Sequence, residues 1–158
     1  MNLQDTKLKD LDLFFLLRLE HLSAEEKAQR IAEIQEIVLI QFAQDDLPKL
    51  LSPEDLNTFE LLVKDPSNSK EIDNFLRSKI PDIDKIILEK MLTAKKEIVR
   101  QNILTRLDVN SKEASDPEVQ RDPDRKQKLY KERESLNNII SAINKDDWGK
   151  VSELVSTL

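Results

Sequence analysis

The chain has 158 residues and a formal net charge of −6, with no cysteine and a single glycine. The absence of cysteine excludes disulfides, thiolate zinc sites and cysteine nucleophiles. With one glycine the chain also lacks the glycine-rich phosphate loops and the nucleophile elbow, whose turns depend on glycine backbone angles.

The N-terminal part of the sequence predicts two helices. Apolar residues between Leu8 and Leu22 recur at intervals of three and four, which is typical of a short helix. Ser23-Ala24-Glu25-Glu26 fits a capping box that starts a second helix, expected to reach about Ala43. Its run from Ile37 to Phe42 is apolar on nearly every side, so we expect this part of the helix to lie centrally, with contacts on several sides.

The middle of the chain predicts three further helices. A turn is expected from Asp45 to Leu51, and Ser52-Pro53 then provides a cap and an N1 proline for the third helix. A loop over 65–69 separates it from a fourth helix that Pro81 stops. Asp82 caps a fifth and longest helix, which is expected to run to about Leu107.

The sequence changes character after Leu107. Residues 108–127 contain two prolines and only three apolar side chains, too few to offset the entropy of ordering, so we expect a charged flexible linker. Apolar stripes on both sides of 144–147 predict a helical hairpin over 128–158. The predicted fold is therefore all-α: an irregular bundle of about five helices over 1–107, the linker, and the C-terminal hairpin.

One stretch of the chain resembles a known family. The motifs LSAEEKAQRIAEI, LLSPEDLNTFELLV and FLRSKIPDIDKIILEKML follow one another within about residues 19–100. In this order and spacing they resemble a family of short all-helical bacterial proteins of unknown function from candidate-phylum genomes. The resemblance implies an all-helical fold and brings no activity, ligand or catalytic residue.

Two apolar stripes are candidate surfaces for a partner protein or for self-association. The first lies in the N-terminal helix and the second in the last helix. Each stripe has two interpretations: it closes the protein's own core, or it is exposed for docking. The candidate partner-binding residues are Phe14, Phe15, Leu17, Trp148, Val151 and Val155.

A basic helix provides the alternative function. Positive side chains outnumber negative ones along 85–106, and such a stripe could contact the phosphates of a nucleic acid or of a ribosome. The opposing interpretation is that the cations lie all around the helix and serve ordinary structural roles. The candidate residues for this function are Lys90, Lys95, Lys96 and Arg100.

Catalysis is not expected. His21 is the only histidine, and no metal-binding loop or paired Glu-x-x-His motif surrounds it or any acid pair. We expect no cofactor and no metal, and the N-terminal apolar patch is too short and too acidic for a signal sequence or a membrane span. The sequence thus predicts a cytoplasmic, non-enzymatic protein-interaction or scaffold module, with an accessory protein of nucleic acid or the ribosome as the alternative.

Overall fold

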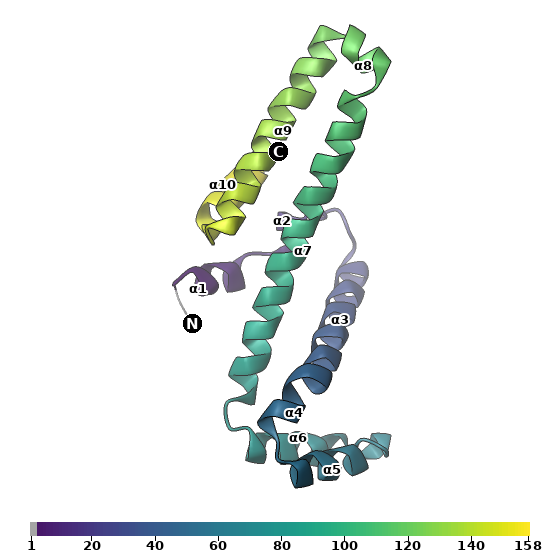
Figure 1. Cartoon of the computed structure of the whole chain (residues 1–158), viewed down its shortest axis with the longest axis vertical. Coiled ribbons are helices and arrows are strands. Elements are labelled where there is room, and N and C mark those ends of the chain that lie inside the picture. The colour runs from purple at the N-terminus through teal and green to yellow at the C-terminus, as the bar shows by residue number, and fades with distance from the viewer. Residues whose placement is uncertain (1–2) are drawn as a thin grey trace. The chain divides into compact units, whose positions relative to one another are not determined.

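The computed structural model describes residues 3–158, and the side chains from residue 7 onward. The protein is 84 % helical, and no strand occurs in the described range, which confirms the predicted all-α class (Figure 1). The elements are α1 (Leu3–Asp10), α2 (Leu13–Leu16), α3 (Ala24–Gln41), the π-helix η1 (Phe42–Asp46), α4 (Leu47–Leu50), α5 (Pro53–Leu62), the 3-10 turn η2 (Pro66–Asn68), α6 (Ser69–Lys79), α7 (Ile83–Ala114), α8 (Pro117–Arg121), α9 (Pro123–Asn144) and α10 (Trp148–Ser156).

The chain divides into two compact units. Unit 1 consists of residues 1–23 and 95–158, and unit 2 consists of residues 24–94. Helix α7 contributes its first part to unit 2 and the rest to unit 1. The predicted boundaries, a bundle over 1–107 and a separate hairpin over 128–158, differ from this division because the N-terminal segment and the second part of α7 belong with the hairpin.

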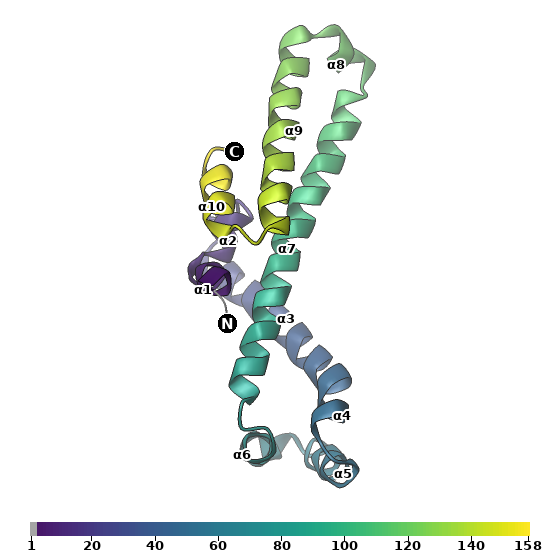
Figure 2. The ribbon, with the colours of Figure 1, turned by 60° about the vertical axis from the view of Figure 1, so that its left-hand side comes forward.

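Unit 1 is built on a pair of long helices. Helix α9 runs back alongside the second part of α7, and α10 folds against α9 (Figures 1 and 2). Short α1 lies against α10. Fully buried aliphatic side chains of α2, α7, α9 and α10, together with the single tryptophan, form the core of unit 1: Leu16, Val99, Ile103, Leu136, Ile139, Ile143, Trp148, Val151 and Val155.

The first predicted helix is in fact two short ones. The side chain of Asp12 accepts the amide protons of Phe14 at 2.6 Å and of Phe15 at 3.0 Å, so a new helix starts there. Arg18, with φ of 59°, then ends α2 in a left-handed conformation. The apolar spacing is continuous across the break, which explains why it predicted one helix.

The prediction of a flexible linker over 108–127 is wrong. Helix α7 extends to Ala114, and α8 and the start of α9 occupy the rest. Asp116 and Asp122 each accept amide protons from the turn that follows them, and each precedes a proline at the first helical position. The two prolines therefore start helices, and Val119 between them is buried.

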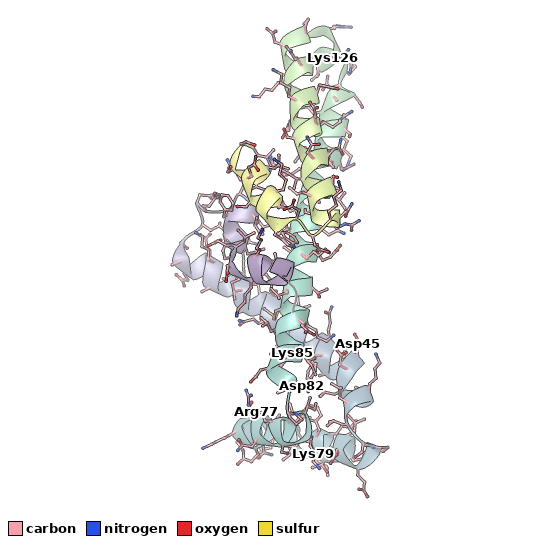
Figure 3. All side chains as sticks on the ribbon, turned by 90° about the vertical axis from the view of Figure 1, so that its left-hand side faces the viewer. Asp45, Arg77, Lys79, Asp82, Lys85 and Lys126 are labelled. Atoms are coloured by element: carbon pink, nitrogen blue, oxygen red, sulfur yellow. The ribbon has the colours of Figure 1, made fainter. Side chains whose placement is uncertain are left out.

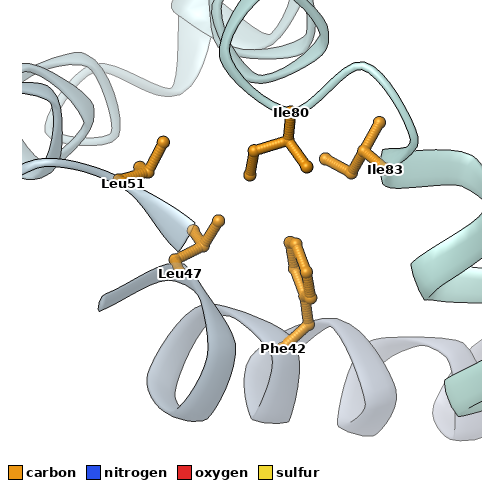
Figure 4. Close-up of a cluster of buried hydrophobic side chains, with 5 residues drawn as sticks. All are labelled: Phe42, Leu47, Leu51, Ile80 and Ile83. Carbon is orange, nitrogen blue, oxygen red and sulfur yellow. The ribbon is translucent and has the colours of Figure 1, made fainter. Parts of the chain in front are cut away.

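Unit 2 is a small cluster of helices around a separate core. Helices α5 and α6 are neighbours, with α5 next to the end of α4 and α6 next to the start of α7 (Figures 1 and 2). The predicted start of α5 is confirmed, since the Ser52 hydroxyl accepts the Asp55 amide at 3.1 Å. The close-up in Figure 4 shows how buried residues from η1, α4, the C-terminal caps of α4 and α6, and the start of α7 converge: Phe42, Leu47, Leu51, Ile80 and Ile83.

A π-helical turn replaces the predicted turn at 45–51. The Leu47 amide donates to the carbonyl of Phe42, five residues back, and the chain continues as α4. Pro48 explains the wider turn, because its ring would collide with the carbonyl of Gln44 in a regular α-helix. Turns of this kind are common at functional sites.

Candidate functional site

An apolar groove lies in unit 2. It has a volume of about 280 Å³, and nine of its thirteen lining residues are apolar. The π-helical turn contributes to it directly, since Phe42 and Ala43 line the groove together with Leu47 of α4. The other apolar residues come from α3, α5, α6 and α7: Leu39, Phe59, Ile72, Leu76, Ile83 and Ile87.

A bridging arginine lies beside this apolar lining. Arg77 Nε donates to both carboxylate oxygens of Asp73 at 3.0 Å, and Arg77 Nη1 donates to Asp84 Oδ2 at 2.6 Å. All three residues line the groove, and the bridge connects α6 to the first turn of α7. Hydrogen bonding to Arg77 lowers the pKa of the Asp84 carboxyl.

Two further ion pairs connect the elements around the groove. Lys79 Nζ lies 2.9 Å from Asp55 Oδ1 and joins α6 to α5, while Lys90 Nζ lies 2.5 Å from Asp46 Oδ2 and joins α7 to η1. Figure 3 shows Arg77 and Lys79 together on α6. The helices that line the groove are thus held to one another by charged side chains outside the apolar core.

The neighbouring part of α3 exposes large apolar side chains. Val38 and Phe42 are buried, but Ile37, Leu39 and Ile40 are 55 %, 49 % and 48 % exposed. The prediction that this part of α3 lies centrally is therefore wrong. A continuous apolar run covers a full helical turn, and here only one side of that turn meets the core.

The predicted partner-binding residues lie mostly in the core of unit 1. Phe14, Trp148, Val151 and Val155 are buried, and Phe15 and Leu17 are partly buried. The structure thus corrects the prediction of a docking surface. It supports the competing interpretation, in which both stripes close the protein's own core.

The basic residues proposed for nucleic acid are engaged within the chain. Lys90 pairs with Asp46, Lys96 Nζ lies 2.6 Å from Asp146 Oδ1, and Arg100 Nη1 lies 3.5 Å from Glu97 Oε1.

Lys95 has a different role, because its ammonium group donates to the backbone carbonyls of Leu8, at 2.7 Å, and Leu11 at the end of α1. Burial lowers the pKa of Lys95, while the charges of Asp12 and Asp10 oppose this effect. All four candidate residues thus have contacts within the chain.

The groove was not predicted from the sequence. Leu39, Phe59, Ile72 and Leu76 fit the helical periodicity of core residues, and no pattern distinguishes a side chain in the core from one beside a groove. The unbroken run of Ile37 to Ile40 was the available signal, because a helix that is apolar all round needs partners on every side.

Across the side chains that the structure describes, no three His, Asp or Glu residues come together to hold a metal. None of the helices in residues 3–158 combines the length and apolarity needed to cross a bilayer. Comparison of the chain with protein-family models, with curated proteins and with solved structures finds no match. The assignment of function therefore depends on the geometry of the groove.

Proposed function

We propose that the chain is a non-enzymatic helical protein-interaction module and that the groove of unit 2 is its contact surface. One observation carries this proposal: an apolar groove of about 280 Å³ lies beside a helix whose Leu39 and Ile40 are about half exposed. Large apolar side chains in contact with water are unfavourable, and an apolar patch of this kind marks an interaction site.

The construction of the groove also supports binding of a protein segment. Its lining comes from five helices and a π-helical turn. Ion pairs of Arg77, Lys79 and Lys90 connect these elements to one another. A surface that is already formed needs little ordering when it binds, which favours affinity. Its lining is aliphatic and aromatic, with one carboxylate pair held by an arginine, and this suits apolar anchors better than a reacting substrate.

The test is site-specific photo-crosslinking in cells. A photoreactive amino acid at position 39 is expected to crosslink to a discrete protein, either another protein or a second copy of the chain. Leu61 on α5 is the matched control, since it is 64 % exposed and does not line the groove. No crosslink at position 39, or equal crosslinking at both positions, would overturn the proposal.

A variant provides the second readout. Leu39→Glu introduces a charge at the edge of the groove, and the half-exposed position tolerates it with little loss of stability. The complex found by crosslinking is expected to be lost in Leu39→Glu and retained in Leu61→Glu. Circular dichroism of both variants verifies that the helices remain folded.

A further inference from the structure

The negative charge of the protein is concentrated in one unit. Residues 24–94, which form unit 2, contain 15 acidic and 9 basic residues, while the remainder contains 16 of each. The whole formal net charge of −6 therefore belongs to the unit that carries the groove.

The residues around the groove share this acidic character. Asp73 and Asp84 line it, and the one basic residue that lines it, Arg77, is already bound to both carboxylates. Glu36 is exposed and precedes Leu39 by three residues, so both lie on the same side of α3. The carboxylates that border the apolar surface thus outnumber the cations that line it.

We propose that the groove binds an amphipathic helix of another protein, with a polar face rich in lysine and arginine. This inference rests on the proposed function and specifies its partner. Apolar side chains at helical spacing would occupy the groove, as in other helix-in-groove complexes. Basic side chains on both sides of that stripe would contact the carboxylates. The negative electrostatic potential of unit 2 would accelerate the association of the basic helix with the groove.

The charge also argues against a second copy of the chain as the occupant. Two copies that met through unit 2 would bring together two surfaces of the same sign, and like charges at an interface are unfavourable. The basic segment within the chain, at the start of α9, offers no free apolar stripe, since Leu129 and Leu136 are buried in unit 1. A different protein is therefore the better match.

Two designed peptides test the inference on the full-length chain. The first is an amphipathic helix with leucine on one face and lysine on the other, and the second has glutamate in place of every lysine. In fluorescence anisotropy titrations the lysine peptide is expected to bind at least about tenfold more tightly than the glutamate peptide at low salt. This difference is expected to shrink as salt screens the charges.

Four variants of the chain locate the binding. Leu39→Gln, which removes the apolar contact without adding charge, is expected to abolish binding of the lysine peptide, and Leu61→Gln is expected to leave it unchanged. Glu36→Lys and Glu60→Lys change the net charge equally, but only Glu36 lies beside Leu39, so Glu36→Lys is expected to weaken binding several-fold more than Glu60→Lys.

The outcomes separate the inference from the proposed function. If both peptides bind equally and Leu39→Gln abolishes both, the groove is an apolar docking site and the basic partner is wrong. If the lysine peptide binds Leu39→Gln as well as Leu61→Gln, attraction is independent of the groove, and the inference is overturned. Absence of binding by either peptide also overturns the inference, as does crosslinking at position 39 to a second copy of the chain. Crosslinking at position 39 to any one protein still supports the proposed function.

Discussion

Lys96 Nζ of α7 lies 2.6 Å from Asp146 Oδ1, in the turn between α9 and α10. Asp146 has a left-handed backbone with φ of 54°, and aspartate tolerates this conformation better than most residues. The pair therefore anchors a strained turn to a helix that is 50 residues away in the sequence. A lysine that the sequence offered as a phosphate ligand has a structural role.

We expect Lys96→Ala to lower the free energy of unfolding by at most about 1 kcal/mol, as is typical of a partly exposed ion pair. Asp146→Asn removes the charge and keeps the tolerance for the left-handed backbone. A double-mutant cycle between the two variants is expected to show coupling in chemical denaturation. Lys145→Ala, at an adjacent exposed lysine, is the control. Absence of coupling between Lys96→Ala and Asp146→Asn would contradict the ion pair between these residues.

Trp148 provides a sharper test of the core of unit 1. Its side chain is 1 % exposed, so Trp148→Ala is expected to destabilise the unit by about 3–5 kcal/mol through loss of burial and an unfilled cavity. Denaturation followed by circular dichroism measures this change. As the single tryptophan of the chain, Trp148 is also expected to emit at short wavelength and to shift to longer wavelength on unfolding. A native emission typical of exposed indole would contradict its burial.

Asn110 is the buried polar residue between α7 and α9. Its side-chain amide donates to the Leu129 carbonyl at 3.0 Å and to Glu132 Oε2 at 3.1 Å, and its oxygen accepts from Arg133 Nε at 3.1 Å. Asn110→Ala removes these three hydrogen bonds and is expected to reduce the free energy of unfolding by about 1–3 kcal/mol. The exposed neighbour Ser111, replaced by alanine, is the control and is expected to change stability much less.

Asn110 also shows why the sequence misassigned residues 108–127. Local chemistry predicts the all-helical class, the helix start at Ser52 and Pro53, and the helix end before Pro81. The structure agrees with all three. The order in 108–127 depends on contacts with α9, including the hydrogen bonds of Asn110, which composition does not reveal.

The sequence also did not show which apolar side chains are buried. The sequence placed Trp148 in an apolar stripe and Leu39 in a continuous apolar run, and both were expected to find partners, yet the first is buried and the second is about half exposed. Which stripe remains open depends on how helices meet in space, and this information is not local. The candidate site therefore came from the structure alone, while the class of fold was predictable from the spacing of apolar residues.

The arginine beside the groove predicts a measurable pKa change. Arg77 lowers the pKa of Asp84 from its ordinary value of 3.8, so this carboxylate stabilises the folded protein above that pH and the contribution is lost as the pH falls through the folded pKa. Arg77→Gln is expected to raise the pKa of Asp84 toward 3.8 and to make stability less sensitive to acid. An NMR titration of the side-chain carboxyls measures the shift.

Lys79→Gln is the matched control for the Arg77 variant. Lys79 lowers the pKa of Asp55 by hydrogen bonding, so its replacement is expected to raise the pKa of Asp55 and leave that of Asp84 in place. Equal shifts of both carboxyls in either variant would show a general change of charge and would contradict the specific pairs.

The single glycine predicts a stabilising substitution. Gly149 lies in the first turn of α10 without a positive φ, so glycine is not required for its backbone conformation. A Cβ atom there would lie 3.5 Å from Lys7 Nζ and 3.7 Å from Asp147 Oδ1, which are ordinary contacts. Gly149→Ala is expected to raise the free energy of unfolding by up to about 1 kcal/mol, because alanine loses less backbone entropy in a helix.

Thermal and chemical denaturation measure the effect of Gly149→Ala. Lys7→Ala tests whether the Lys7 side chain opposes the substitution. If Gly149→Ala raises stability only when Lys7 is also replaced, the added methyl group displaces the Lys7 side chain. A loss of stability in both backgrounds would mean that α10 approaches its neighbours more closely at Gly149 than the 3.5 Å separation implies. A gain in both backgrounds is the expected result, because Lys7 Nζ is the flexible end of an exposed side chain and can move without disturbing the core.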